Sequence, residues 1–166
     1  LNENIQNLVY IIIVVFTILF PLLTALVLKK LNVISSLYMK KAEERKWPFT
    51  LTVLWYYLCF EILLKLQLPK SIYLMMIGAI TVVTIALIVT LKWKISVHML
   101  GIGGLLGALI GLSYRFNLDW LLIIIAITLM SGLVGYARLE TKSHNPNQVY
   151  VGFIIGLSIE LVAVLL

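Results

Sequence analysis

Long apolar runs separated by short polar connections dominate this sequence of 166 residues. A membrane-spanning helix needs roughly 20 predominantly apolar residues, and shorter runs are tolerated where the bilayer thins. Six segments meet this requirement, at about 8–28, 49–66, 72–91, 95–112, 120–136 and 149–166. Because no connection is long enough to separate two domains, residues 1–166 are expected to form one all-α domain, a polytopic bundle of six transmembrane helices. Pro21, inside the first run, is expected to kink it.

The composition agrees with an integral membrane protein. Hydrophobic residues make up 62% of the chain and charged residues only 12%, whereas soluble domains carry about 25% charged residues. The single cysteine, Cys59, lies within an apolar run. A disulfide framework within the chain and a cysteine-based metal site are therefore excluded.

Basic side chains are distributed unevenly between the two ends of the expected bundle. The connections after the first, third and fifth spans share one face and carry ten of the 13 Lys and Arg residues. The other face carries only Lys65, Lys70 and Arg115. The positive-inside rule would explain this bias and make the ten-residue face cytoplasmic. Both histidines, His98 and His144, fall on the same face, however, and a topology rule does not gather histidines, so the pattern favours a site for an anionic group.

Two pairs of polar residues on this face suit phosphate chemistry. Arg138 and His144 lie six residues apart between the last two expected spans, and Ser96 and His98 lie two residues apart near the start of the fourth. Guanidinium groups are good donors to phosphate oxygens, and imidazole can act as a phosphoryl nucleophile or a proton donor. The sequence therefore predicts phosphate chemistry at a membrane surface.

Three segments of this face, in chain order, resemble the motifs of the phosphatidic acid phosphatase type 2 superfamily of membrane lipid phosphatases. These motifs are K-x6-R-P, P-S-G-H and S-R-x5-H-x3-D. Arg138 and His144 keep the spacing of the third motif, with Ala137 at its Ser position and Gln148 at its Asp position. The six-span layout also fits the family, so the similarity covers nearly the whole chain.

The other two motifs are matched in part. Ile95–Ser96–Val97–His98 keeps the Ser and His of the second motif but has neither its Pro nor its Gly. Lys40, six residues and then Trp47–Pro48 keep the spacing of the first motif, with Trp at the Arg position and Arg45 nearby. The pattern is similar to a bacterial branch of the family with degenerate motifs.

The resemblance implies a metal-independent hydrolase that removes phosphate from a membrane lipid through a phosphohistidine intermediate. His144 would be the nucleophile and His98 the general acid, while Arg138 would stabilise the oxygens of the transferring group. Gln148, one helical turn after His144, would orient it through the amide oxygen. The remaining phosphate ligands would be Ser96, Lys40, Lys41 and Arg45. No cofactor and no metal are expected.

The expected partners are a membrane lipid phosphate and the surrounding bilayer, with no nucleic acid. The identity of the lipid and the oligomeric state stay open. The family resemblance implies a bacterial inner membrane protein whose site faces away from the cytoplasm, whereas the charge bias points to the opposite orientation. We follow the resemblance on this point.

Other functions fit the sequence less well. A relative that binds lipid phosphate without hydrolysing it is the main alternative, because Gln148 lacks the negative charge of the family Asp. A small transporter is less favoured, because the polar residues gather at one end of the spans rather than at the midplane. An intramembrane protease built on Ser96 and His98 is less favoured still, because residues two apart on a helix do not face each other.

Two features within the spans complete the sequence-based expectations. Gly104, Gly107 and Gly111 share one helix face, where small residues allow another span to pack closely. Glu160 lies deep in the last span and either finds a polar partner or keeps its proton.

Overall fold

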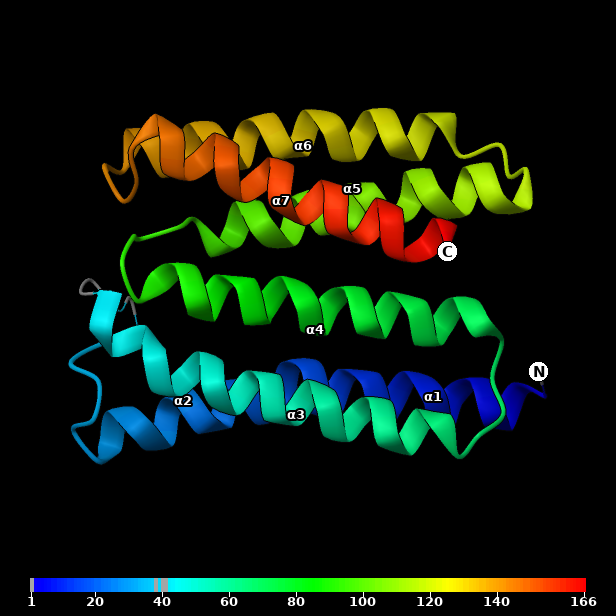
Figure 1. The fold of residues 1–166 in the computed structure, drawn as a ribbon, viewed down its shortest axis with the longest axis horizontal. Helices are drawn as coiled ribbons and strands as arrows, with labels where there is room; N and C mark the ends of the chain where they lie inside the picture. Colours follow the sequence, from blue (N-terminus) through cyan, green and yellow to red (C-terminus); the bar gives the residue numbers. More distant parts are fainter. Residues whose placement is uncertain (1, 38, 40–41) are drawn as a thin grey trace.

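The computed structural model describes residues 2–37, 39 and 42–166, which form helices joined by short connections (Figure 1). The elements are α1 (Glu3–Val14), the π-helical η1 (Val15–Leu19), α2 (Phe20–Lys30), the 3-10 turn η2 (Ala42–Arg45), α3 (Lys46–Leu64), α4 (Lys70–Thr90), α5 (Val97–Phe116), α6 (Leu121–Glu140) and α7 (Pro146–Leu165). Within the described residues there is no strand. Six helical stretches are long and apolar enough to cross a membrane. The prediction of an all-α chain with six membrane-length helices is therefore confirmed for these residues.

Two helices near the candidate site extend beyond their predicted bounds. The fifth stretch was predicted to end near residue 136, but α6 continues to Glu140 and includes Arg138 in its last turn. The sixth was predicted from residue 149, but α7 begins at Pro146. Proline is well suited to the first position of a helix, and Asn145 caps this one, so polar residues outside the apolar run are helical.

Pro21 is accommodated by a local change of helix type. The π-helical segment η1 immediately precedes Phe20 and Pro21 in the first long stretch. Proline has no N–H to donate to the carbonyl four residues earlier, which here belongs to Thr17. That carbonyl instead accepts a hydrogen bond from the hydroxyl of Tyr56 on α3 at 3.4 Å. A neighbouring helix therefore satisfies the backbone group that the proline leaves without a donor.

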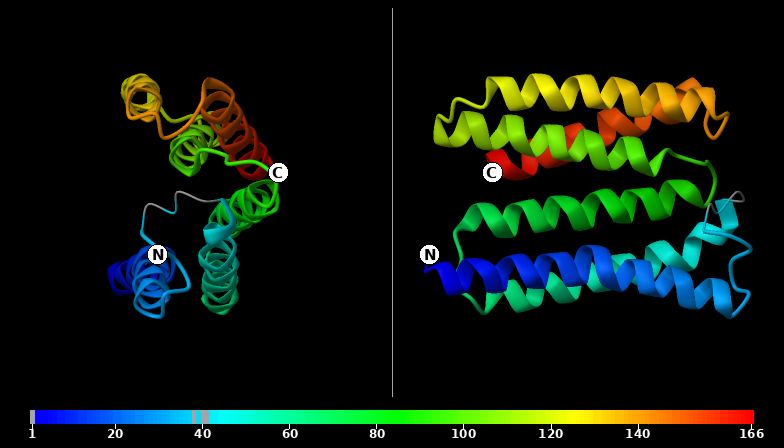
Figure 2. Two further views of the ribbon diagram at one scale, coloured as in Figure 1. Left: turned by 90° about the vertical axis from the view of Figure 1, so that its left-hand side faces the viewer. Right: turned by 180° about the vertical axis from the view of Figure 1, so that it is seen from behind.

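The helices form two groups that meet between α4 and α7. Figures 1 and 2 show α5, α6 and α7 on one side and α1 to α4 on the other. Helix α4 contacts both α3 and α7. The connections α2–α3, α4–α5 and α6–α7 lie at one end of the molecule, and both termini lie at the other (Figure 1). This arrangement brings together three polar segments that are distant in the sequence.

Helices α5 and α7 approach each other most closely. A Cβ atom added at Gly103 or Gly107 of α5, or at Gly156 of α7, would overlap a backbone carbonyl of the facing helix. Gly104 and Gly111 also face α7. The glycines that the sequence assigned to helix packing therefore lie at this interface, together with Gly103, which the sequence did not single out. The close approach sets the relative position of the two helices that carry His98 and Gln148.

Glu160 lies where α7 packs against both α4 and α5. Its side chain is buried, and its Oε2 has no hydrogen-bond partner among the described residues. Gly78 of α4 and Gly104 of α5 leave space for it, since a Cβ at Gly78 would lie 2.5 Å from Oε2. Of the two expectations for this carboxyl, a polar partner is not found for Oε2 among the described residues.

The outer surface of the helices is strongly apolar. Leu122 and Leu129 on α6 are 81% and 66% exposed, and many other large hydrophobic side chains are exposed along the six stretches. Contiguous apolar surface of this extent is unusual on soluble monomers. The fold is compatible with a multi-pass membrane protein.

Candidate active site

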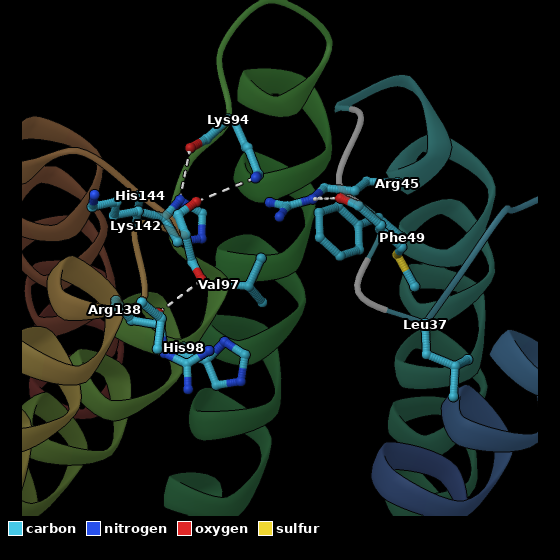
Figure 3. A pocket seen from close by; sticks show the side chains of 12 residues that line it. Leu37, Arg45, Phe49, Lys94, Val97, His98, Arg138, Lys142 and His144 are labelled. Atoms are coloured by element: carbon cyan, nitrogen blue, oxygen red, sulfur yellow. Dashed lines mark hydrogen bonds between the residues drawn. The ribbon is translucent and has the colours of Figure 1, made fainter.

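A pocket of about 970 Å³ lies at the end of the molecule where the three connections meet (Figure 3). Its polar wall consists largely of basic and imidazole side chains, namely Arg45, Lys94, His98, Arg138, Lys142 and His144. Its apolar wall is formed by Leu37, Met39, Phe49 and Val97. No Asp or Glu is found among the described residues that line it. The pocket is therefore suited to an anion attached to an apolar group.

The start of α7 holds His144 in a defined orientation. Asn145 Oδ1 accepts the backbone N–H of Gln148 at 2.9 Å, and Gln148 Oε1 accepts the backbone N–H of Asn145 at 3.2 Å, which together form a capping box. His144 Nδ1 lies 3.1 Å from the same Gln148 Oε1 and 3.3 Å from the carbonyl oxygen of Lys94. Both neighbours are acceptors, so Nδ1 carries the proton and Nε2 keeps its lone pair.

The surroundings of His144 favour its neutral form. Burial lowers the pKa of His144 below its usual value. The hydrogen bond to Gln148 opposes this change, while the positive charges of Arg45 and Lys94 reinforce it. The pKa of Lys94 is also lowered, first by burial and then by the charge of Arg45. A neutral imidazole with a lone pair on Nε2 is the form that can attack phosphorus.

Lys94 joins the α4–α5 connection to the α6–α7 connection, two of the three segments that form the pocket. Its Nζ donates a hydrogen bond to the carbonyl of Ser143 at 3.2 Å, while its own carbonyl accepts from His144 (Figure 3). Lys94 and Lys142 were not among the predicted site residues and contributed only to the charge bias. The position of Lys94, two residues before Ser96 in the second motif, was the available signal.

Arg45 links the group of helices α1 to α4 to the connection that leads into α5. Its side chain is only 7% exposed. One guanidinium nitrogen donates to the carbonyl of Ile95 at 3.0 Å, and Nε donates to the carbonyl of Met39 at 3.4 Å. Trp47, at the Arg position of the first motif, is 53% exposed and does not line the pocket. Among the described residues of this segment, Arg45 is therefore the basic one that lines the pocket.

His98 and Arg138 reach the same pocket from the first turn of α5 and the last turn of α6 (Figure 3). The Nε atom of Arg138 is buried and has no hydrogen-bond partner among the described residues. Because Arg138 lines the pocket, its guanidinium could donate to an anion there. The structure thus brings His144, His98, Arg138 and Arg45 together around one space, with Gln148 behind His144.

The structure bears on only one of the three remaining predicted phosphate ligands, Ser96. Lys40 and Lys41 lie outside the described residues. Ser96 is fully buried and is absent from the pocket lining, and its Oγ has no hydrogen-bond partner in the described part of the chain. Its backbone N–H donates to the carbonyl of Gln148 at 3.2 Å, because the extended residues before α5 pack against the start of α7. The expected contact between Ser96 and a phosphate oxygen is therefore not supported.

Comparison with protein-family models, with characterised proteins and with solved structures finds no match to this chain. The chemistry of the pocket follows from its own side chains. Among the described lining residues, four Lys or Arg side chains and two imidazoles could bind an anion, and a neutral, oriented imidazole could attack it. Within the described residues, no group of three or more His, Cys, Asp or Glu side chains is placed to hold a metal ion.

Proposed function

We propose that the chain is a membrane-embedded lipid phosphate phosphohydrolase that uses His144 as its nucleophile. The observation that carries this proposal is the hydrogen bond between His144 Nδ1 and Gln148 Oε1, at 3.1 Å on the wall of a basic pocket. A fixed Nδ1–H tautomer leaves Nε2 available for attack. The apolar outer surface of the helices supports insertion of the chain in a bilayer.

The proposed reaction has two steps. In the first, Nε2 of His144 forms a bond to phosphorus while the bond from phosphorus to the lipid oxygen breaks, and His98 gives its proton to that oxygen. In the second step, water attacks phosphorus and gives a proton to His98, while the bond between phosphorus and Nε2 of His144 breaks. Inorganic phosphate then leaves, and both histidines are restored. Arg45, Lys94 and Arg138 would stabilise the charge on the phosphoryl oxygens in both steps.

The two walls of the pocket support a lipid phosphate as the substrate class. The cations suit a phosphomonoester or diphosphate, and the apolar wall with Phe49 and Leu37 suits the lipid part next to it. A bacterial cytoplasmic membrane, with the site on its extracytoplasmic face, is the location that the family resemblance favours. Phosphatidic acid, phosphatidylglycerophosphate and undecaprenyl diphosphate all have the required headgroup chemistry.

Phosphate release by the purified, detergent-solubilised protein tests the proposal on these three lipids. The wild type is expected to release phosphate in EDTA and to be inhibited by vanadate, which mimics five-coordinate phosphorus, while His144→Ala is inactive. Because the described residues of the pocket lining include four cations and no carboxylate, we expect the charge on the phosphoryl group to need no Mg²⁺. Activity that disappears in EDTA and returns with a divalent metal would contradict the proposed mechanism.

A second candidate function is the binding of lipid phosphate without hydrolysis. The neutral Gln148 favours it, since an amide fixes the imidazole tautomer but supplies no negative charge to stabilise an imidazolium. On this alternative, wild type binds lipid phosphates with an affinity that falls in Arg138→Ala, but no lipid in the panel is hydrolysed.

A further inference from the structure

Lys142 has a backbone conformation that lysine rarely adopts. Its φ is 50°, in the left-handed region, and it directly follows the cap residue Thr141 at the end of α6. Glycine is the residue most often found at this place after a helix, because a side chain at positive φ crowds its own backbone. Glycine at position 142 would therefore suit the fold better, and the lysine needs another explanation.

The turn at Lys142 joins two residues of the candidate active site. The carbonyl of Arg138 accepts hydrogen bonds from the N–H of Ser143 at 3.2 Å and of His144 at 3.4 Å. The N–H of Lys142 donates to the carbonyl of Leu139 at 2.9 Å. All of these bonds use the main chain and would also form with glycine at position 142. The turn therefore does not require the lysine side chain.

Comparison with the other described residues at positive φ shows what is unusual about Lys142. Asn32 and Asn117 are of a type that tolerates this conformation. Gln67 lies in the α3–α4 connection at the other end of the molecule (Figure 1). Met39 and Lys142 line the basic pocket. Among the described residues, Lys142 is thus the charged one that combines positive φ with a place on the pocket wall.

The ammonium group of Lys142 is available to a ligand. Its side chain is exposed where it lines the pocket, and it has no hydrogen bond or ion pair within the described part of the chain (Figure 3). By contrast, Arg45 is buried and donates to the carbonyl of Ile95, while Lys94 is half-buried and donates to the carbonyl of Ser143. Lys142 therefore lies at the rim of the pocket, nearer to its opening than these two cations.

The positive charge of the pocket exceeds the negative charge of one phosphate group. The described lining includes four Lys or Arg side chains and no carboxylate. A phosphomonoester carries about 1.5–2 negative charges at pH 7. Arg45, Lys94 and Arg138 match this charge, so Lys142 is left for a further negative charge of the ligand. The volume of about 970 Å³ leaves room for such a group.

We propose that Lys142 is a specificity-determining residue that binds a second phosphate group of the substrate at the rim of the pocket. The inference rests on the proposed function and selects a lipid diphosphate as its substrate. Nε2 of His144 forms a bond to the terminal phosphorus, and the bond from that phosphorus to the bridging oxygen breaks. The bridging oxygen takes the proton of His98 and leaves on the lipid monophosphate, beside the ammonium of Lys142. Water then gives a proton to His98 and releases inorganic phosphate from His144.

The test compares farnesyl diphosphate with farnesyl monophosphate, which differ only in the second phosphate group. In Lys142→Gly, kcat/KM is expected to fall about tenfold on the diphosphate and less than about twofold on the monophosphate, because one charge-assisted hydrogen bond is lost. Lys142→Arg keeps the charge and is expected to keep the activity on the diphosphate. An equal fall on both substrates in Lys142→Gly, or no fall on the diphosphate, overturns the proposal.

Thermal unfolding in detergent gives a second readout on the same variant. Lys142→Gly is expected to unfold at a higher temperature than wild type, because glycine is not strained at this φ. Gln67→Gly makes the same backbone change at the other end of the molecule and should raise the unfolding temperature without changing the ratio of diphosphate to monophosphate activity. Lys142→Gly that is less stable than wild type would show that the lysine serves the fold, and would overturn its assignment to the substrate.

Lys92→Gly controls for the general effect of charge. Lys92 is exposed at the same end of the molecule and does not line the pocket, so this variant should leave the ratio of the two activities unchanged. A fall in the ratio as large as that in Lys142→Gly would reveal a long-range electrostatic effect in place of a contact. That result would also overturn the proposal.

Binding measurements keep the proposal testable if no hydrolysis is found. Titration calorimetry gives the Kd of each farnesyl phosphate for His144→Ala and for the double variant that also carries Lys142→Gly. The added change is expected to raise the Kd of the diphosphate about tenfold and that of the monophosphate less than about twofold. This result supports Lys142 even if wild type hydrolyses neither substrate, an outcome that would refute only the proposed hydrolysis. Equal changes in the two Kd values, or no change, overturn the role of Lys142.

Discussion

His144 Nδ1 and Gln148 Oε1 lie 3.1 Å apart, and the same Oε1 accepts the backbone N–H of Asn145 at 3.2 Å. One amide oxygen therefore serves both the capping box that begins α7 and the orientation of the proposed nucleophile. The side chain at position 148 needs the length of a glutamine to make both contacts. A change there tests the chemistry of His144 and the stability of the helix start together.

Gln148→Glu is expected to maintain or raise turnover. Glutamate has the same length, is well suited to this position of a capping box, and adds a negative charge that stabilises the imidazolium. The sequence alone suggested Asp here, but Asp is one methylene shorter than the side chain that makes the observed contacts. Phosphate release from a lipid phosphate at saturating substrate measures the effect.

Gln148→Leu is the contrasting variant and is expected to lower kcat at least about tenfold, or roughly 1.4 kcal/mol of barrier. It also removes one capping bond, which costs about 0.5–2 kcal/mol of stability. Thermal unfolding in detergent separates the two effects. Full turnover in Gln148→Leu would show that Gln148 does not position His144.

Lys94→Met is expected to move the acid limb of the pH profile of kcat/KM to higher pH. The positive charge of Lys94 helps to hold the pKa of His144 below 6.5, so its loss raises that pKa. Activity requires the neutral imidazole and falls as pH drops through its pKa, so a raised pKa brings the fall at higher pH. Lys92→Met, at an exposed neighbour outside the pocket lining, is the control and should leave the limb in place.

Arg45→Lys is expected to lower kcat/KM nearly as much as Arg45→Met, by about 10²-fold. The guanidinium of Arg45 donates to the carbonyls of Ile95 and Met39 from different nitrogens while it lines the pocket. A lysine ammonium supplies the charge but not this planar set of donors. Steady-state kinetics and a stability measurement on each variant check the prediction. A kcat/KM equal to that of wild type in Arg45→Lys would show that the planar set of donors of Arg45 is not required.

The six membrane-length helices could be predicted because hydropathy is a property of continuous segments. Their ends near the site could not, because residues outside the apolar runs, such as Arg138 and Pro146, are included in α6 and α7 by capping and by the continuation of a regular helix. The gathering of His98 and His144 at one end followed from alternation of the spans. It needed no knowledge of side-chain positions.

Which motif residues line the pocket depends on how the segments pack, and the spacing of residues in the sequence does not determine this packing. Ser96 has the right place in the second motif, yet the extended backbone before α5 turns it away from the pocket and against α7. Arg45 is displaced by two residues from the Arg position of the first motif, and the 3-10 turn η2 brings it to the pocket.

Gly156→Ala is expected to destabilise the fold and to reduce activity, because a Cβ there would overlap the carbonyl of Leu100 on α5. The two helices would have to separate, at a cost of about 1–3 kcal/mol for overpacking. Separation also moves His98 on α5 away from Gln148 and His144 at the start of α7. Unfolding in detergent and phosphate release, measured on the same preparation, check both effects.

Gly101→Ala is the matched control, since it makes the same change in α5 where a Cβ meets no atom within 4 Å. An alanine in a helix interior is favoured over glycine by up to about 1 kcal/mol, so this variant should be as stable as wild type or more so. If Gly156→Ala were equally stable and active, the close approach of α5 and α7 would not be what aligns the two histidines. A loss of activity in Gly156→Ala with unchanged stability would instead show that the close contact matters only for aligning the two histidines. The helices would then have shifted to accept the methyl group, and that shift would have disrupted the reaction.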